Sequence, residues 1–142
     1  MKTIKVYTDG SCHNSGNKSM GIGVVVYGTK LIKEIAEYAG IGTSNRAEWE
    51  ALISGLNFTV NYVLENYPNE RVIIECYLDS KIVVGIITDI YSNVNFKSEY
   101  RRVKSLENKL KETHKLDYIW IPREDNEEAD RLSKIGNPHF KS

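Results

Sequence analysis

The apolar residues of this chain change their spacing near residue 44, and this change limits the folds that the chain can adopt. Before it, residues 3–9, 21–28 and 31–39 have the alternating or short apolar patterns of β-strands. The short connection Gly28-Thr29-Lys30 predicts an antiparallel pairing of the second and third strands. After it, apolar residues recur every three or four positions and predict a long buried helix. They are Ala47, Ala51, Leu52, Gly55, Leu56, Thr59, Val60 and Val63.

Strands and helices alternate in the rest of the chain. Residues 71–78 and 116–121 are expected to be strands, and residues 82–90, 97–115 and 126–135 are expected to be helices. Loops are expected at 40–44 and at the break marked by Asn93 and Asn95.

The predicted element order is β-β-β-α-β-α-α-β-α. Strands that are connected through helices should be parallel, with right-handed crossovers. We therefore expect a single α/β domain over residues 1–142. Its three layers would contain a mixed five-stranded sheet, with three antiparallel strands followed by two parallel ones, flanked by helices.

Composition restricts the possible function classes. The 142 residues are 41% hydrophobic, enough for one compact core, and 19 basic residues balance 19 acidic ones. Bulk charge therefore does not indicate a nucleic-acid partner. Cys12 and Cys76 lack the spacing of a zinc site or a disulfide framework. The sequence shows neither a basic-then-apolar leader nor an apolar run long enough to cross a bilayer, so a cytoplasmic protein without membrane contact is expected.

Two aspartates follow predicted central strands. Asp9 starts the segment Asp9-Gly10-Ser11, and an Asp-Gly pair after a strand is usually a turn. Asp79 ends an almost wholly apolar strand, where an aspartate can equally be the N-cap of the next helix. Adjacent parallel strands present their ends side by side, so the two aspartates together favour a shared site.

Glu48 lies near the start of the first long helix and has a specific structural alternative. Asn45 as N-cap with Glu48 three residues later matches a capping box, which is the favoured interpretation of Glu48 considered alone. Glu50 lies on a different face of this helix. It has no comparable partner in the sequence, so we expect it to be solvated.

Asp130 lies in the last helix, whose first turn is strongly acidic. Acidic residues there complement the helix macrodipole, and either Asp125 or Asn126 is the expected cap. Asp130 lies a full turn further along the helix. The small Ala129 beside it would let the helix approach the edge of the sheet.

If these four carboxylates converged, they would repel one another strongly without a counter-charge. Such a cluster is typical of a site for hard divalent cations, which prefer oxygen ligands. Two ions ~3.5–4 Å apart can clamp a phosphodiester, one activating water and the other stabilising the leaving oxygen. The sequence places all four carboxylates at strand ends and helix starts that should lie on one side of the sheet. The spacing alone does not establish that the four converge.

Four segments in this order resemble type 1 ribonuclease H, over residues 3 to about 135. They are Thr8-Asp9-Gly10-Ser11, Thr43-Ser44-Asn45-Arg46-Ala47-Glu48, Leu78-Asp79-Ser80 and Asn126-Glu127-Glu128-Ala129-Asp130-Arg131-Leu132-Ser133. The resemblance implies the ribonuclease H-like fold and cleavage of the RNA strand of RNA–DNA hybrids. It also implies two Mg²⁺ ions, for which Mn²⁺ could substitute, and products with 3′-hydroxyl and 5′-phosphate ends.

The resemblance further implies roles for single residues. Asp9 would bridge both ions, Asp130 would help to hold the ion that activates water, and Glu48 and Asp79 would complete the other. Glu48 would also contact the ribose 2′-hydroxyl, which distinguishes RNA from DNA. The expected substrate contacts are Gly10, Ser11, Cys12 and Asn45 in the minor groove, Thr43 at a DNA phosphate, and Lys81, where the family often has glutamine.

The chain also departs from the family pattern. The loop Asn14-Ser15-Gly16-Asn17 lacks the usual proline, and the segment from Ile90 to Lys97 is too short for the basic handle of many members. Arg123-Glu124-Asp125 stands where many members have a loop histidine, as in a branch that lacks it. His13, His114 and His139 do not match that position and are expected to be solvent or core histidines.

Residues 97–115 carry seven Lys or Arg against three Glu. This excess could partly replace the handle, since each neutralised phosphate adds affinity. Alternatively, the helix face is solvated and its charges pair with one another.

We therefore expect a monomeric, metal-dependent endoribonuclease that acts on RNA–DNA hybrids. An alternative is a nucleic-acid-binding module of the same fold with little or no catalysis. A third is another two-metal nuclease, such as an exonuclease or a resolvase. The Asn-Arg-x-Glu helix start and the closing Glu-Ala-Asp argue against this third function.

Overall fold

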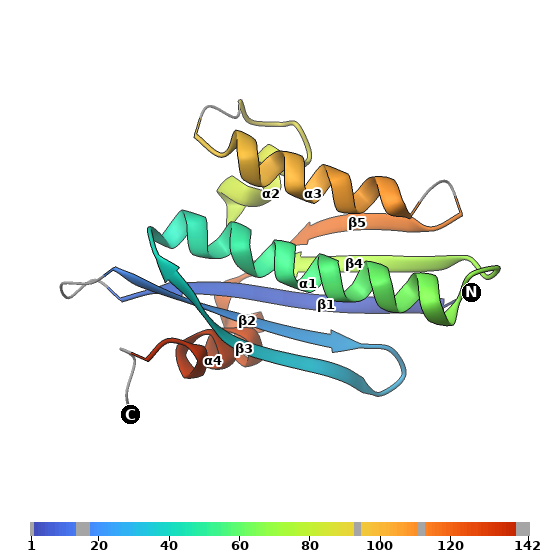
Figure 1. The fold of residues 1–142 in the computed structure, drawn as a ribbon, viewed down its shortest axis with the longest axis horizontal. Coiled ribbons are helices and arrows are strands. Elements are labelled where there is room, and N and C mark those ends of the chain that lie inside the picture. The colour runs from blue at the N-terminus through green and yellow to red at the C-terminus, as the bar shows by residue number, and fades with distance from the viewer. Residues whose placement is uncertain (1, 14–17, 93–94, 111–112, 139–142) are drawn as a thin grey trace.

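A computed structural model describes residues 2–13, 18–92, 95–110 and 113–138, which form one mixed sheet with helices on both faces (Figure 1). The strands are β1 (Lys2–Cys12), β2 (Ser19–Tyr27), β3 (Leu31–Ile41), β4 (Val72–Leu78) and β5 (Lys115–Trp120). The helices are α1 (Ser44–Asn66), α2 (Lys81–Ile87), α3 (Lys97–Lys109) and α4 (Glu127–Gly136), with a 3₁₀ turn, η1 (Arg123–Asp125), before α4. The strand order is β3-β2-β1-β4-β5.

The pairing confirms the predicted mixed sheet. β1, β2 and β3 are antiparallel neighbours, and β1, β4 and β5 are parallel neighbours joined through helices. The short turn after Gly28 joins β2 and β3 as expected.

The core lies between α1 and the sheet, with α3 packed beside α1 (Figure 1). Leu52, Leu56 and Val60 of α1 are completely buried against the strands, which confirms the predicted apolar stripe. Burial of a side chain of this size contributes about 2 kcal/mol. α4 covers part of the opposite face, over β1, β2 and β3. Within the described residues, no helix has both the length and the apolar character needed to cross a bilayer.

β1 is longer than predicted. Its antiparallel pairing with β2 continues to Cys12, opposite Met20, whereas its parallel pairing with β4 ends at Tyr7, opposite Tyr77. Asp9 therefore does not end a strand: it lies within β1, just beyond the last β1–β4 pair. β3 likewise continues to Ile41, because it stays paired with β2, and this shortens the expected loop at 40–44.

The helix caps correct two predicted alternatives. The N-cap of α1 is Thr43, whose hydroxyl accepts a hydrogen bond from the Arg46 amide at 3.2 Å, so Asn45 is not the cap. The N-cap of α2 is Ser80 and not Asp79. Thr43 caps α1 two residues before Asn45, and Ser80 caps α2 one residue after Asp79. The carboxylates of Glu48 and Asp79 therefore have no capping role.

α3 ends earlier than predicted, at Lys109. β5 begins at Lys115, opposite Ile73 of β4, so the chain must already be extended there. His114 is buried, as a core histidine would be, and its Nδ1 accepts a hydrogen bond from the Val72 amide at 3.0 Å. Several predicted features lie outside the described residues: the loop 14–17, the break at Asn93, positions 111–112 of the predicted helix, and His139.

Candidate active site

Gly10 allows α1 to cross β1 at very short range. A Cβ atom on Gly10 would lie 2.2 Å from the carbonyl carbon of Ala47 and 2.5 Å from the amide nitrogen of Glu48. Any other residue would therefore push α1 away from the sheet. The Gly10 amide donates to Glu48 Oε1 at 3.1 Å, which fixes the Glu48 side chain beside Asp9. The Asp-Gly pair is thus part of a strand that builds the site and is not a turn.

Asp79 is held by two residues that the sequence analysis did not assign to the site. The side-chain amide of Asn126 donates to Asp79 Oδ2 at 3.2 Å and to the Thr8 carbonyl at 2.9 Å. The indole Nε1 of Trp120 donates to the Asp79 carbonyl at 3.1 Å. Asn126 occupies the N-cap position of α4, as one prediction had it, but its side chain makes no capping hydrogen bond. It joins β1 to the end of β4 instead.

Asp9, Glu48 and Asp79 converge. Each offers a carboxylate oxygen, and the three oxygens lie within 4.8 Å of one another. Burial, and then the charge of Glu48, raises the pKa of Asp9 to about 11. Burial also raises the pKa of Glu48, to about 7, and that of Asp79. Three carboxylates cannot all be ionised at this range without a counter-charge.

The donor set fits a hard divalent cation. All three ligands are carboxylates, the oxygen donors that Mg²⁺ and Mn²⁺ prefer. Glu48 Oε2 is a buried oxygen that finds no hydrogen-bond partner in the described part of the chain. An unsatisfied buried acceptor is costly, and a bound cation would satisfy it.

Asp130 lies at the edge of this group. Burial raises the pKa of Asp9 and of Asp79, and the Asp130 carboxylate raises both further, so it faces them. It also pairs with Lys134 at 3.2 Å and with Arg123 at 3.8 Å. The structure therefore brings three of the predicted carboxylates into one cluster and places the fourth beside it.

A glycine on β2 sets the position of Asp130. A Cβ atom on Gly23 would lie 2.1 Å from the Ala129 carbonyl oxygen, so α4 rests directly on the β2 backbone. The hydroxyl of Ser11 donates to the Ser133 carbonyl at 3.0 Å and ties α4 to β1. The close approach predicted from Ala129 thus depends equally on Gly23, a residue that the sequence analysis did not use.

The predicted substrate contacts fall into two groups. The side chains of Ser11 and Cys12 are used inside the fold, since Cys12 Sγ donates to the Gly42 carbonyl at 3.5 Å. Thr43, Asn45 and Lys81 lie at the starts of α1 and α2, and Asn45 and Lys81 are exposed. The Lys81 ammonium lies 4.7 Å from the centre of the Trp120 ring, next to Asp79.

Part of the basic excess on α3 is paired. Arg102 contacts Glu50 at 2.6 Å, and Lys104 contacts Glu107 at 3.4 Å. Glu50, which we expected to be solvated surface, is instead partly buried and paired with Arg102, because α3 packs beside α1. Lys97, Arg101 and Lys109 form no ion pair with the acidic residues that the structure describes, and they keep the phosphate-binding hypothesis open.

Comparison with known proteins decides the family. The family model for RNase H matches residues 1–137. This chain belongs to the ribonuclease H family. It is 32% identical to the Ribonuclease H of Erythrobacter litoralis, with 94% of each chain covered. It is 29% identical to that of Baumannia cicadellinicola, covering 99% of this chain and 94% of the relative. These similarities identify a ribonuclease H hydrolase.

Solved ribonuclease H structures have the same fold. LC11-RNase H1, isolated from compost, superposes with a TM-score of 0.81 at 28% identity, covering 96% of each chain. RNase H1 from Halobacterium salinarum NRC-1 gives 0.80 at 22% identity, covering 94% of this chain and 96% of that one. LC11-RNase H1 has also been solved in complex with an RNA/DNA hybrid, and that structure gives 0.78 at 28% identity, covering 91% of this chain and 92% of that one.

Proposed function

We propose that this ribonuclease H hydrolyses the RNA strand of RNA–DNA hybrids, with Asp9, Glu48, Asp79 and Asp130 as its catalytic and metal-binding residues. The observation that carries the proposal is the convergence of the Asp9, Glu48 and Asp79 carboxylates. Two Mg²⁺ ions, replaceable by Mn²⁺, would supply an activated water and stabilise the leaving oxygen, giving 3′-hydroxyl and 5′-phosphate ends.

Each residue has a distinct task in this proposal. Asp9 interacts with Glu48, Asp79 and Asp130, and it would be shared between the two metal positions, with Glu48 and Asp79 at one and Asp130 at the other. The Gly10 amide holds Glu48 Oε1, which leaves Oε2 free to bind. Asn126 and Trp120 fix Asp79 from two sides. A cluster held in this way pays little reorganisation when the phosphodiester arrives.

Selection of the hybrid would come from the surface around the cluster. Glu48 would contact the ribose 2′-hydroxyl, the group by which proteins tell RNA from DNA. The backbone from Gly10 to Cys12, together with Asn45, would lie in the minor groove, and Thr43 and Lys81 would approach phosphates. The hybrid-bound structure of LC11-RNase H1 supports a hybrid as the substrate.

The proposal includes three further features. The chain would act as a monomer, as a single domain over residues 1–142, and in the cytoplasm. The single sheet, which pairs strands from both ends of the chain, supports the single domain.

The test is cleavage of an RNA–DNA hybrid with end-labelled RNA in the presence of Mg²⁺ or Mn²⁺, beside RNA–RNA and DNA–DNA duplexes. We expect cleavage of the hybrid alone. The variants Asp79→Asn and Glu48→Gln should lose activity by a factor of about 10² or more. Glu65→Gln, an exposed position on the same helix as Glu48, is the matched control and should leave the rate unchanged.

Two results would contradict the proposal in different ways. Absence of hybrid cleavage by the unaltered protein, with hybrid binding retained, would indicate the binding module instead. Undiminished cleavage by Asp79→Asn would keep the activity and reject the site.

A further inference from the structure

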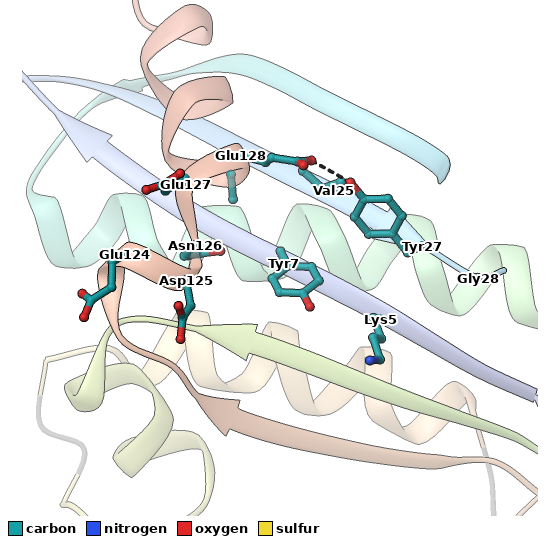
Figure 2. Close-up of a pocket in the computed structure, with 11 residues that line it drawn as sticks. Lys5, Tyr7, Val25, Tyr27, Gly28, Glu124, Asp125, Asn126, Glu127 and Glu128 are labelled. Atoms are coloured by element: carbon teal, nitrogen blue, oxygen red, sulfur yellow. Dashed lines mark hydrogen bonds between the residues drawn. The ribbon is translucent and has the colours of Figure 1, made fainter. Parts of the chain in front are cut away.

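A pocket of about 490 Å³ is lined in part by Asn126, the residue that holds Asp79, and has no role in the proposed reaction (Figure 2). β1 contributes Lys5 and Tyr7 to it, β2 contributes Val25 and Tyr27, and η1 with the start of α4 closes one end. Its size is within the range that holds a small ligand or a side chain with its flanking backbone.

Tyrosine rings form the fixed side of this pocket. The Tyr7 ring stacks on Tyr77 of the next strand, with centres 4.7 Å apart and planes 13° from parallel. Tyr27 meets Tyr7 edge-on, at 6.2 Å and 84°. The Tyr27 hydroxyl donates to the Glu128 carboxylate at 2.7 Å, as the dashed line in Figure 2 shows. These contacts hold the rings in place before any ligand binds, which lowers the entropy cost of binding.

Acidic residues make up much of the pocket lining, and Figure 2 shows the side chains of Glu124 and Glu127 extending away from Tyr7 and Tyr27, at its outer edge. Glu124, Asp125, Glu127 and Glu128 line the pocket against one ammonium, that of Lys5. Glu124, Asp125 and Glu127 are exposed, and none forms an ion pair within the described residues. The macrodipole of α4 accounts for Glu127 and Glu128 in its first turn, but Glu124 and Asp125 precede the helix.

Asn126 adds an unsatisfied acceptor to the wall. Its side-chain nitrogen is engaged by two acceptors, the Thr8 carbonyl and Asp79, which fixes the orientation of the amide. Its Oδ1 is buried and has no hydrogen-bond partner among the residues that the structure describes. The pocket is therefore lined by more hydrogen-bond acceptors than donors. A ligand that donates hydrogen bonds and carries positive charge would complement it.

The guanidinium group of arginine meets these conditions together. It carries only donors, binds carboxylates through two parallel hydrogen bonds, and stacks on aromatic faces. A lysine ammonium is a point charge with stronger hydration and gains less from a stacked ring. Nucleic acid is disfavoured here, because the acidic rim repels phosphate.

We propose that this tyrosine-walled pocket docks an arginine side chain from a basic segment of a partner protein. The acidic rim complements such a segment and not the polyanionic substrate, so partner and hybrid would occupy different surfaces. Asn126 lines the pocket and also holds Asp79, so the docked segment would lie directly behind the carboxylate cluster.

The test uses the ¹⁵N-labelled protein with saturating Mg²⁺, which keeps the peptide away from the carboxylate cluster. The probe is a blocked peptide with two arginines separated by glycine, and the control peptide carries neutral citrulline at both positions. We expect the arginine peptide alone to shift the amide resonances of Lys5, Tyr7 and Tyr27. The double variant Glu124→Gln with Glu127→Gln should weaken binding by about fivefold.

The matched control is Glu65→Gln with Glu70→Gln, which removes two exposed carboxylates away from the pocket and should change the affinity by less than about twofold. Equal shifts with the citrulline peptide would overturn the proposal. So would shifts centred on Asp9 and Asp79, or an affinity that the Glu124 and Glu127 changes leave intact. The same shifts on raising the protein concentration without peptide would assign the pocket to a second copy of the chain and also reject it.

Discussion

Asp9 is a residue whose ionisation opposes folding when no cation is bound. Burial first, and the neighbouring Glu48 charge second, raises its pKa from 3.8 to about 11. The folded protein therefore holds this proton more tightly than the unfolded chain does. Stability is greatest below the unfolded pKa and falls as pH rises above it.

Asp9→Asn removes this penalty along with a proposed metal ligand. In EDTA at pH 8 the variant should be more stable than the unaltered protein by about 1–2 kcal/mol, and at pH 4.5 the difference should be smaller. Thermal unfolding at the two pH values measures this. Mg²⁺ should raise the Tm of the unaltered protein and leave that of the variant nearly unchanged. Identical Tm values for both proteins at both pH values would contradict the account.

Asn126 shows how a single side chain can position a carboxylate from a distant element. Asn126→Ala removes the donor to Asp79 and the one to Thr8, and it should lower kcat by about tenfold and stability by about 1–2 kcal/mol. Asn66→Ala removes an exposed amide whose side chain, among the described residues, bonds to the Tyr62 carbonyl within α1, and it serves as the control. Hybrid cleavage and urea unfolding measure the two effects. An Asn126→Ala rate equal to the control rate would remove Asn126 from the site.

The sequence signals for single residues were uneven. The four carboxylates stand in recognisable motifs because metal chemistry restricts the choice of ligand. Asn126 opens the last of these motifs, but nothing in the sequence signals that it holds Asp79, since its two partners lie 118 and 47 positions away and only the folded sheet brings them together. Thr43 and Asn45 are both good cap residues, and local propensity could not rank them.

Among the elements, the contact between α4 and β2 depends on the absence of a side chain at Gly23. Gly23→Ala would place a methyl group 2.1 Å from the Ala129 carbonyl oxygen, so α4 must move. We expect a loss of about 2 kcal/mol or more in urea unfolding, together with reduced cleavage because Asp130 moves with the helix.

Gly28→Ala is the control for this change. Its Cβ would meet first the end of the Ile32 side chain, at 3.2 Å, and that group can shift. The expected loss is below about 1 kcal/mol. Equal losses for the two variants would show that the contact between α4 and β2 is less tight than described.

Element types followed from periodicity, whereas several element ends did not. The apolar stripe of α1 and the alternation in the strands are local properties of the chain. The ends of β1, β3 and α3 are set by partners: β2 pairs with β1 as far as Cys12, and β4 requires an extended chain at Lys115. Such pairings depend on the register between two strands, which cannot be read from the sequence of either strand alone.

In the molecule as a whole, His114 links two segments that are distant in the sequence. It immediately precedes β5 and accepts a hydrogen bond from the Val72 amide at the start of β4. Burial lowers the pKa of this histidine, because the charged imidazole is poorly solvated. The stabilising contact is thus fully present above the unfolded pKa of about 6.5 and is lost as pH falls below it.

His114→Asn keeps an acceptor near the Val72 amide but does not titrate. Between pH 7 and 5.5 the unaltered protein should lose stability relative to this variant, and urea unfolding at several pH values measures the difference. Parallel pH profiles would show that His114 does not couple the two strands in this way.

The metal centre itself can be tested by anomalous diffraction from crystals grown with Mn²⁺. We expect an anomalous peak among the Asp9, Glu48 and Asp79 carboxylates, and its loss in Asp79→Asn crystals. A protein that cleaves the hybrid but shows no peak at these three residues would contradict this expectation.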